Sequence, residues 1–102
     1  MKQNSTVKKR EDYADKLADF IEARKELVWY VKNPRNLDDD AIVEAVLNYG
    51  DWNDVQEMIE IMGIENAAAA FRRTSKPDKF QRTNYHPKTR NYFNFYFNKY
   101  AS

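Results

Sequence analysis

The sequence predicts an all-α protein, a compact single domain built as a bundle of four to five helices. Two glycines and three prolines among 102 residues leave few turns for a β-sandwich or barrel. Apolar residues recur with the 3.6-residue period of helices along most of the chain. Seven Tyr, six Phe and two Trp supply enough bulky side chains for one core at this length. We expect residues 11–102 to form this domain and the polar, basic residues 1–10 to form a flexible tail.

The first helix is expected over residues 11–31, where the apolar side chains fall on one helical stripe. They are Tyr13, Leu17, Phe20, Ile21, Leu27, Val28 and Val31. Asn33 and Pro34 end this segment, because the residue before a proline is pushed out of the α region.

A second helix is expected over residues 39–49, with Asp38 as the N-cap that accepts a backbone N–H. Gly50 stands where a left-handed residue commonly ends a helix. The side chains expected to point inward are Ile42, Val43, Val46, Leu47 and Tyr49.

Two further helices are expected over residues 52–62 and 64–73, with Asp51 as the N-cap of the first and Gly63 between them. The inward side chains of the first are Trp52, Val55, Met58, Ile59 and Met62. Those of the second are Ile64, Ala67, Ala68 and Phe71.

The last helix is expected to begin at Pro87, a residue that suits the first helical position. A polar connection over residues 74–86 precedes it, and we expect Phe80 and Tyr85 to pin this connection to the core. One broad aromatic face covers the helix, formed by Tyr92, Phe93, Tyr96, Phe97 and Tyr100.

Charge is strongly segregated along the chain although the net charge is only +1. Residues 11–71 hold 15 acidic and 5 basic side chains, whereas residues 72–102 hold 8 basic side chains and one acidic residue, Asp78. Surfaces of opposite sign are typical of proteins that bind partners.

Several classes of function are excluded by composition. The chain has no cysteine, which rules out disulfides, thiolate metal sites and a cysteine nucleophile. No apolar run approaches the roughly 20 residues that span a bilayer, and no apolar segment follows the N-terminal lysines as in a signal peptide. We therefore expect a cytoplasmic protein without membrane contact.

No residue pattern indicates catalysis, a metal site or a cofactor, so we expect a protein that is not an enzyme. The run Asp38–Asp40 suits the start of a helix, where carboxylates cap N–H groups and meet the positive end of the dipole. His86 is the only histidine, and no partner for acid–base catalysis is marked near it.

The segment 72–90 is the candidate site for nucleic acid or a protein partner. Its candidate contacts are Arg72, Arg73, Lys76, Lys79, Arg82, Tyr85, Lys88 and Arg90. Cations attract phosphates, and exposed rings stack on unpaired bases. The alternative is that the rings belong to the core and the cations pair with the acidic part of the chain. A helix-turn-helix around Gly63 is a further alternative, with residues 64–73 as the DNA-reading helix.

Two apolar residues lie off the main stripes of their helices, Ile61 and Phe95. Because a side chain off the inward stripe is not committed to the core, they are candidates for exposed apolar contacts with a partner. Tyrosine-rich faces such as that of the last helix most often pack in the core and are also typical interface anchors.

Residues 28–71 resemble a family of small bacterial helical proteins of uncharacterised function. The shared features are a tryptophan in the entry segment, a Leu-Asp pair, a helix ending in Val-Leu-x-x-Gly-Asp, and a glycine after the next helix. In this sequence they are Trp29, Leu37, Asp38, Val46, Leu47, Gly50, Asp51, Asp54 and Gly63. The stretch His86–Phe93 is similar to the Pro-x-Thr segment that leads into an aromatic helix in this family.

Members of that family are often encoded beside abortive-infection nucleotidyltransferase toxins. The resemblance implies an antitoxin-like protein of a bacterial or phage defence system, which binds and neutralises a protein partner such as that toxin. Two other functions stay open: a nucleic-acid-binding module or transcriptional repressor that uses residues 72–90, and a small inhibitor of another enzyme. The sequence leaves the oligomeric state undetermined.

Overall fold

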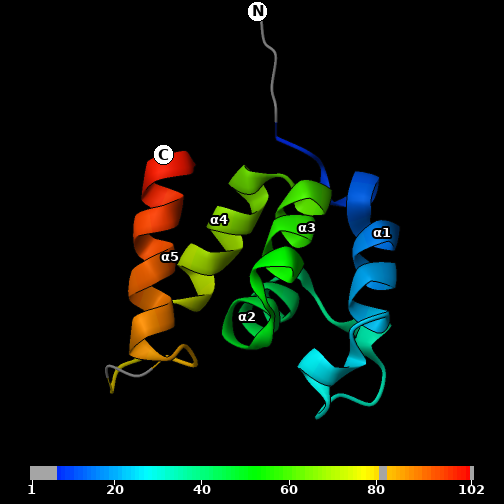
Figure 1. Cartoon of the computed structure of the whole chain (residues 1–102), viewed down its shortest axis with the longest axis horizontal. Helices are drawn as coiled ribbons and strands as arrows, with labels where there is room; N and C mark the ends of the chain where they lie inside the picture. The colour runs from blue at the N-terminus through cyan, green and yellow to red at the C-terminus, as the bar shows by residue number, and fades with distance from the viewer. Residues whose placement is uncertain (1–6, 81–82, 102) are drawn as a thin grey trace, which may run out of the picture.

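The computed structural model describes residues 7–80 and 83–101, and over this part of the chain the fold is all-α, as the sequence predicts (Figure 1). The elements in chain order are α1 (Arg10–Glu22), η1 (Lys25–Val28), η2 (Pro34–Asn36), α2 (Asp39–Tyr49), α3 (Trp52–Met62), α4 (Ile64–Thr74) and α5 (Pro87–Tyr100). Here η marks a short 3₁₀ helix. Residues 1–6 of the expected tail lie outside the described residues.

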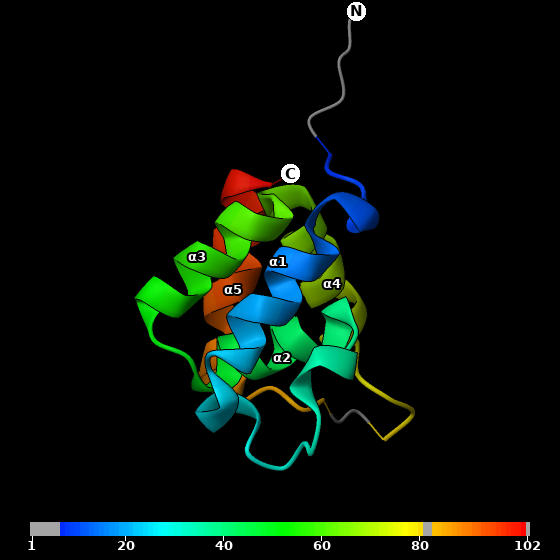
Figure 2. The ribbon, with the colours of Figure 1, turned by 90° about the vertical axis from the view of Figure 1, so that its right-hand side faces the viewer.

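The five helices form a bundle with α4 near its centre. Helix α4 packs against α2, α3 and α5, while α1 packs mainly against α3 and η2. As a result α1 and α5 form opposite edges of the bundle, as two perpendicular views show (Figures 1 and 2). The core contains fully buried side chains from all five helices: Leu17, Ile21, Ile42, Val43, Val46, Met58, Met62, Phe71 and Phe97.

The first helix is shorter than the expected 11–31. It ends at Glu22, and the backbone of Arg24 leaves the helical region before η1 begins. The break accompanies a tertiary contact, because the Arg24 guanidinium turns to reach two carboxylates of α3, Asp54 and Glu57. Leu27 and Val28 are still buried, since η1 brings them back onto the core.

Both predicted aspartate caps are confirmed. The Asp38 carboxylate accepts the Ala41 N–H at 2.9 Å. Asp51 and Asp54 form a reciprocal capping box, in which the Asp51 carboxylate accepts the Asp54 N–H at 2.8 Å and the Asp54 carboxylate accepts the Asp51 N–H at 2.9 Å. Two donors that a helix start leaves unpaired are thereby satisfied.

Glycine is favoured at positions 50 and 63 for different structural reasons. Gly63 ends α3 with φ at 85°, a conformation that side chains rarely adopt, so the predicted stop is confirmed. Gly50 has φ at −79°, and the expectation of a left-handed residue there is wrong. A Cβ at Gly50 would lie 2.8 Å from the Val46 carbonyl oxygen, so close approach, not backbone handedness, favours glycine at that junction.

Three aromatic side chains expected in the core are exposed instead: Tyr49, Trp52 and Phe80. Tyr49 is the last residue of α2 and Trp52 the first of α3, so both lie beyond the packed middle of their helices. Phe80 lies in the connection before α5 and is 62% exposed, whereas Tyr85 is buried as predicted.

Candidate functional site

The structure separates the eight predicted contacts of segment 72–90. Arg72 and Arg73 lie in the last turn of α4. The Arg73 guanidinium contacts the Asp40 carboxylate at 2.8 Å, so this cation pairs with the acidic part of the chain, as the alternative interpretation predicts. Arg72 donates to the Phe97 carbonyl at 3.4 Å. Arg82 lies outside the described residues.

Tyr85 is a core residue, so its assignment to the binding surface is wrong. Only 5% of its surface is exposed. Its hydroxyl shares a hydrogen bond of 2.7 Å with the Thr74 hydroxyl, and its ring centroid lies 5.3 Å from that of Phe71. Burial raises the pKa of the Tyr85 hydroxyl well above its usual range. A ring held in this way is unavailable for stacking on a base.

The remaining cations differ in exposure. Lys76 and Lys79 are exposed in the connection after α4, and Lys88 is exposed in the first turn of α5. Arg90 is half-buried, and its Nε has no hydrogen-bond partner within the described residues. The segment therefore contributes exposed lysines, whereas its candidate stacking ring, Tyr85, is buried.

Helix α4 lies in the middle of the bundle, with exposed residues at its two ends. Four of its side chains are fully buried, namely Ala67, Ala68, Ala70 and Phe71. A recognition helix has to present a long face to the DNA groove. The helices around Gly63 thus form a core hairpin, and the geometry does not favour the helix-turn-helix interpretation.

One group of exposed rings lies where η1 meets the end of α2; we call it the Trp29 cluster, formed by Trp29, Tyr30 and Tyr49. Its ring centroids lie 5.2 Å apart for Trp29 and Tyr30 and 5.0 Å apart for Trp29 and Tyr49, both edge to face. Trp29 is 65% exposed. Partial burial, with the nearby Glu44 carboxylate as the next cause, raises the pKa of Tyr30.

A second group joins the start of α3 to α5; we call it the Trp52 cluster, formed by Trp52, Tyr92 and Tyr96. The Trp52 ring lies 6.2 Å from the Tyr92 ring and 5.4 Å from the Tyr96 ring, again edge to face. Trp52 is 41% exposed, so this contact links the two helices at the surface, outside the core. Each cluster contains a ring, Tyr49 or Trp52, that the periodicity of the sequence places on an inward stripe.

The two candidates for exposed apolar contacts have different outcomes. Phe95 is 80% exposed on α5, as predicted. Ile61 is less exposed than expected, because the N-terminal segment crosses the end of α3 and covers part of it. There Lys8 Nζ donates to the backbone carbonyls of Glu60 and Ile61. A hollow of about 510 Å³ opens beside it, lined by Lys8, Asp12, Tyr13, Lys16, Glu60 and Ile61.

On the α1 side of the molecule, arginines form ion pairs with carboxylates of the same chain. Arg24 contacts Asp54 at 2.8 Å and Glu57 at 2.7 Å, and it lies over the Phe20 ring. Arg35 pairs with two carboxylates of α1. Burial opposes ionisation of Asp54, but hydrogen bonds from Arg24 and from the Asp51 N–H outweigh it and hold the pKa of that carboxyl below its usual range.

The Asp38–Asp40 run has three separate structural roles. Asp38 caps α2, and Asp40 pairs with Arg73. Asp39 accepts the Tyr13 hydroxyl at 2.5 Å and pairs with Arg10 at 2.7 Å. Over residues 7–80 and 83–101, no three His, Asp or Glu side chains gather as metal ligands would.

His86, the only histidine of the sequence, is exposed at the N-cap of α5. Within the described part of the chain, none of the helices has the length and apolar character needed to cross a bilayer. Comparisons of the sequence with protein-family models, curated proteins and solved structures give no match.

Proposed function

We propose that this chain is a non-enzymatic, antitoxin-like binding protein that binds and neutralises a protein partner such as a nucleotidyltransferase toxin. The observation that carries the proposal is the set of large aromatic side chains left on the surface of a bundle whose core is well filled. Trp29, Phe95 and Tyr92 are each more than half exposed. Exposed apolar groups of this size mark interaction surfaces.

The residue types favour a protein partner. Tryptophan and tyrosine are the usual anchors of protein interfaces, because they bury a large area with few rotatable bonds. The identity of the partner as a toxin rests on the family resemblance. Trp29 supports it, because it is one of the residues that carry the resemblance and yet contributes little to the core.

A nucleic-acid-binding function is the second candidate, and an inhibitor of another enzyme is a third. Exposed Lys76, Lys79 and Lys88 favour nucleic acid, since lysines bind phosphates. Against it, Asp40 already neutralises Arg73 and Tyr85 is buried. An enzyme inhibitor would use the same aromatic surfaces as an antitoxin, so the identity of the captured partner separates those two.

The test is capture of the partner from the organism that encodes the chain. Tagged wild-type protein is compared with a variant that carries Trp29→Ala and Phe95→Ala, two exposed residues whose loss should leave the fold intact. We expect one stoichiometric protein partner with the wild type and at least tenfold less with the variant. The captured protein is then produced in cells with and without this chain, and the chain should relieve its toxicity.

Gel shifts at about 0.15 M salt decide between the candidates. Submicromolar binding to DNA or RNA that falls steeply with salt, together with no captured protein, would favour the nucleic-acid function. A captured protein that is an enzyme inhibited by the chain, but not a toxin, would favour the third.

A further inference from the structure

The outer face of α5 has the spacing of a helix-packing seam. Lys88, Tyr92, Phe95 and Lys99 follow one another at intervals of four, three and four residues, the spacing of the a and d positions of a coiled coil. All four side chains are exposed. The inner face of the same helix is formed by Phe93 and Phe97, whose rings lie 6.3 and 5.4 Å from that of Phe71. One face of α5 thus fills the core, while the other presents two exposed rings, Tyr92 and Phe95, between two exposed lysines.

The cations of this helix have no carboxylate partner inside the described part of the chain, although Lys99 Nζ lies 5.4 Å from the centroid of the Tyr100 ring. No carboxylate among the described residues lies within ion-pair distance of Lys88, Arg90 or Lys99. By contrast Arg10, Arg24, Arg35 and Arg73 all form ion pairs. No acidic residue follows Asp78 in the sequence. The positive charge along α5 is therefore uncompensated on its own helix.

We propose that this outer face of α5 is the docking surface for an acidic amphipathic helix of the protein partner; the inference rests on the proposed function and names the partner's chemistry. Apolar side chains of the partner helix would pack around Phe95 and Tyr92. Its carboxylates would meet Lys88 and Lys99, which lie about 16 Å apart along the axis at a rise of 1.5 Å per residue. Asn91 and Asn98 border the stripe and offer amide hydrogen bonds at its rim.

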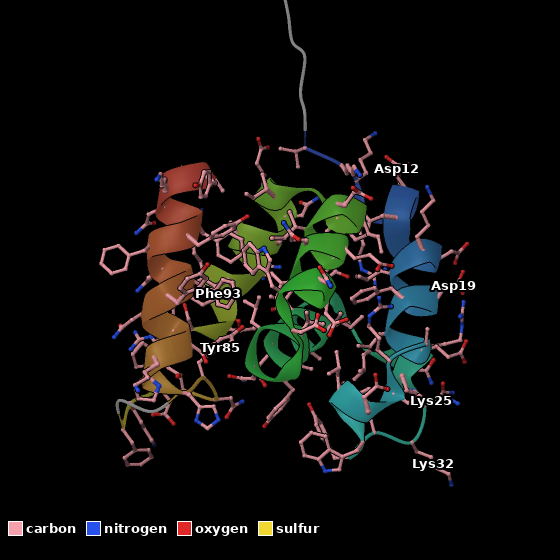
Figure 3. The ribbon with its side chains drawn as sticks, viewed as in Figure 1. Asp12, Asp19, Lys25, Lys32, Tyr85 and Phe93 are labelled. Atoms are coloured by element: carbon pink, nitrogen blue, oxygen red, sulfur yellow. The ribbon has the colours of Figure 1, made fainter. Side chains whose placement is uncertain are left out.

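Charge argues against a second copy of this chain as the occupant. Two α5 faces packed together would place lysines against lysines. The acidic edge of a second copy is α1, whose exposed residues are all charged: Arg10, Glu11, Asp12, Asp15, Lys16, Asp19 and Glu22. Figure 3 shows two of them, Asp12 and Asp19, at the opposite edge from Phe93. Such a face offers no apolar side chain to cover Phe95.

The test is site-specific photocrosslinking of the full-length chain in the organism that encodes it. The photoreactive amino acid p-benzoylphenylalanine replaces Phe95, a residue of similar shape. Matched control chains carry it at Tyr30, in the Trp29 cluster, and at Lys16, on the acidic edge. We expect a protein adduct from position 95 and none from position 16. The crosslinked peptide should have a net negative charge and apolar residues at helical spacing.

A second measurement uses Lys88→Glu and Lys99→Glu together on the position-95 chain. Reversal of both charges should lower the adduct yield at least tenfold while the far-ultraviolet circular dichroism is unchanged. An adduct with a basic peptide, with a second copy of this chain or with nucleic acid would overturn the proposal. An adduct from position 30 alone would overturn the docking surface and leave the protein-binding function standing. No adduct from any position would contradict both.

Discussion

The two edges of the bundle use charge in opposite ways. At the α1 edge, arginines are matched to carboxylates within the chain, as Arg24 is to Asp54 and Glu57. At the α5 edge, aromatic rings hold the helix in place, and its cations have no carboxylate among the described residues. The comparison shows that charge segregation along a sequence does not imply that the two parts pair with each other. Arg73 with Asp40 is an ion pair that does join them.

The largest effect on the free energy of unfolding is expected from loss of the aromatic contacts that hold α5 on the core. Phe71 is fully buried and contacts the rings of Tyr85, Phe93 and Phe97. Phe71→Ala should lower the free energy of unfolding by about 3–5 kcal/mol, as large-to-small core changes do. Urea denaturation measures it. Trp52→Ala is the matched control, because this half-exposed ring should cost clearly less; equal losses would contradict the placement of Trp52 at the surface.

The next largest effect on the free energy of unfolding is expected from loss of the ion pair between Arg24 and Asp54. Arg24 and Asp54 are each about four-fifths buried, with side-chain exposures of 21% and 19%. Arg24→Met keeps the aliphatic packing but leaves Asp54 without its cation, which should cost about 1–3 kcal/mol of unfolding free energy. Arg35→Gln is the control, because this exposed guanidinium should give no resolvable change. A larger loss for Arg35 than for Arg24 would reverse the assignment of the structural ion pair.

Acid should weaken the ion pair that joins Arg24 to Asp54 of α3. The pKa of Asp54 is lower in the folded chain than its unfolded value of about 3.9, so its ionised form stabilises the fold above that pH. This contribution is lost as the pH falls below about 4 through the folded pKa. The free energy of unfolding, measured between pH 5 and pH 3, should fall more steeply for the wild type than for Arg24→Met. Parallel slopes would show that Arg24 does not set the pKa of Asp54.

The smallest effect on the free energy of unfolding is expected from the exposed lysines of α5. Lys88→Glu with Lys99→Glu should change the free energy of unfolding by less than about 0.5 kcal/mol, since both lysines are exposed and neither pairs with a carboxylate among the described residues. Thermal melts at low and high salt check it. A clear destabilisation would mean that these lysines serve the fold, and the argument for a docking surface would lose its electrostatic support.

Local rules predicted the helices better than the surface. The bounds of α2 and α3 match those expected, because Asp38, Asp51 and Gly63 mark them through contacts only a few residues apart. Periodicity predicts burial for Tyr49 and Trp52, and both are exposed. An apolar stripe gives the inward face of a helix but does not indicate where the neighbouring helices end. The break in α1 depends on Arg24 reaching α3 thirty residues away, and no local signal marks it.

Sequence patterns predict the exposure of some candidate contacts and not of others. Phe95 was identified because it lies off the inward stripe of its helix, and it is exposed. Tyr85 was placed on the binding surface because it stands among cations, but a hydrogen bond to Thr74 holds it in the core. The Trp29 cluster was missed, since its members come from two segments that only the fold brings together.

The packing of α5 has a consequence for local unfolding. This helix has α4 as its main neighbour, whereas α2, α3 and α4 surround one another. Elements at the margin of a core often open as a separate cooperative unit, with a smaller free energy than global unfolding. Amide hydrogens in the middle of α5 should therefore exchange with solvent faster than those of α4. A partner bound along α5 would stabilise this helix against local unfolding and slow the exchange of its amide hydrogens. Hydrogen exchange in α5 would then also detect binding.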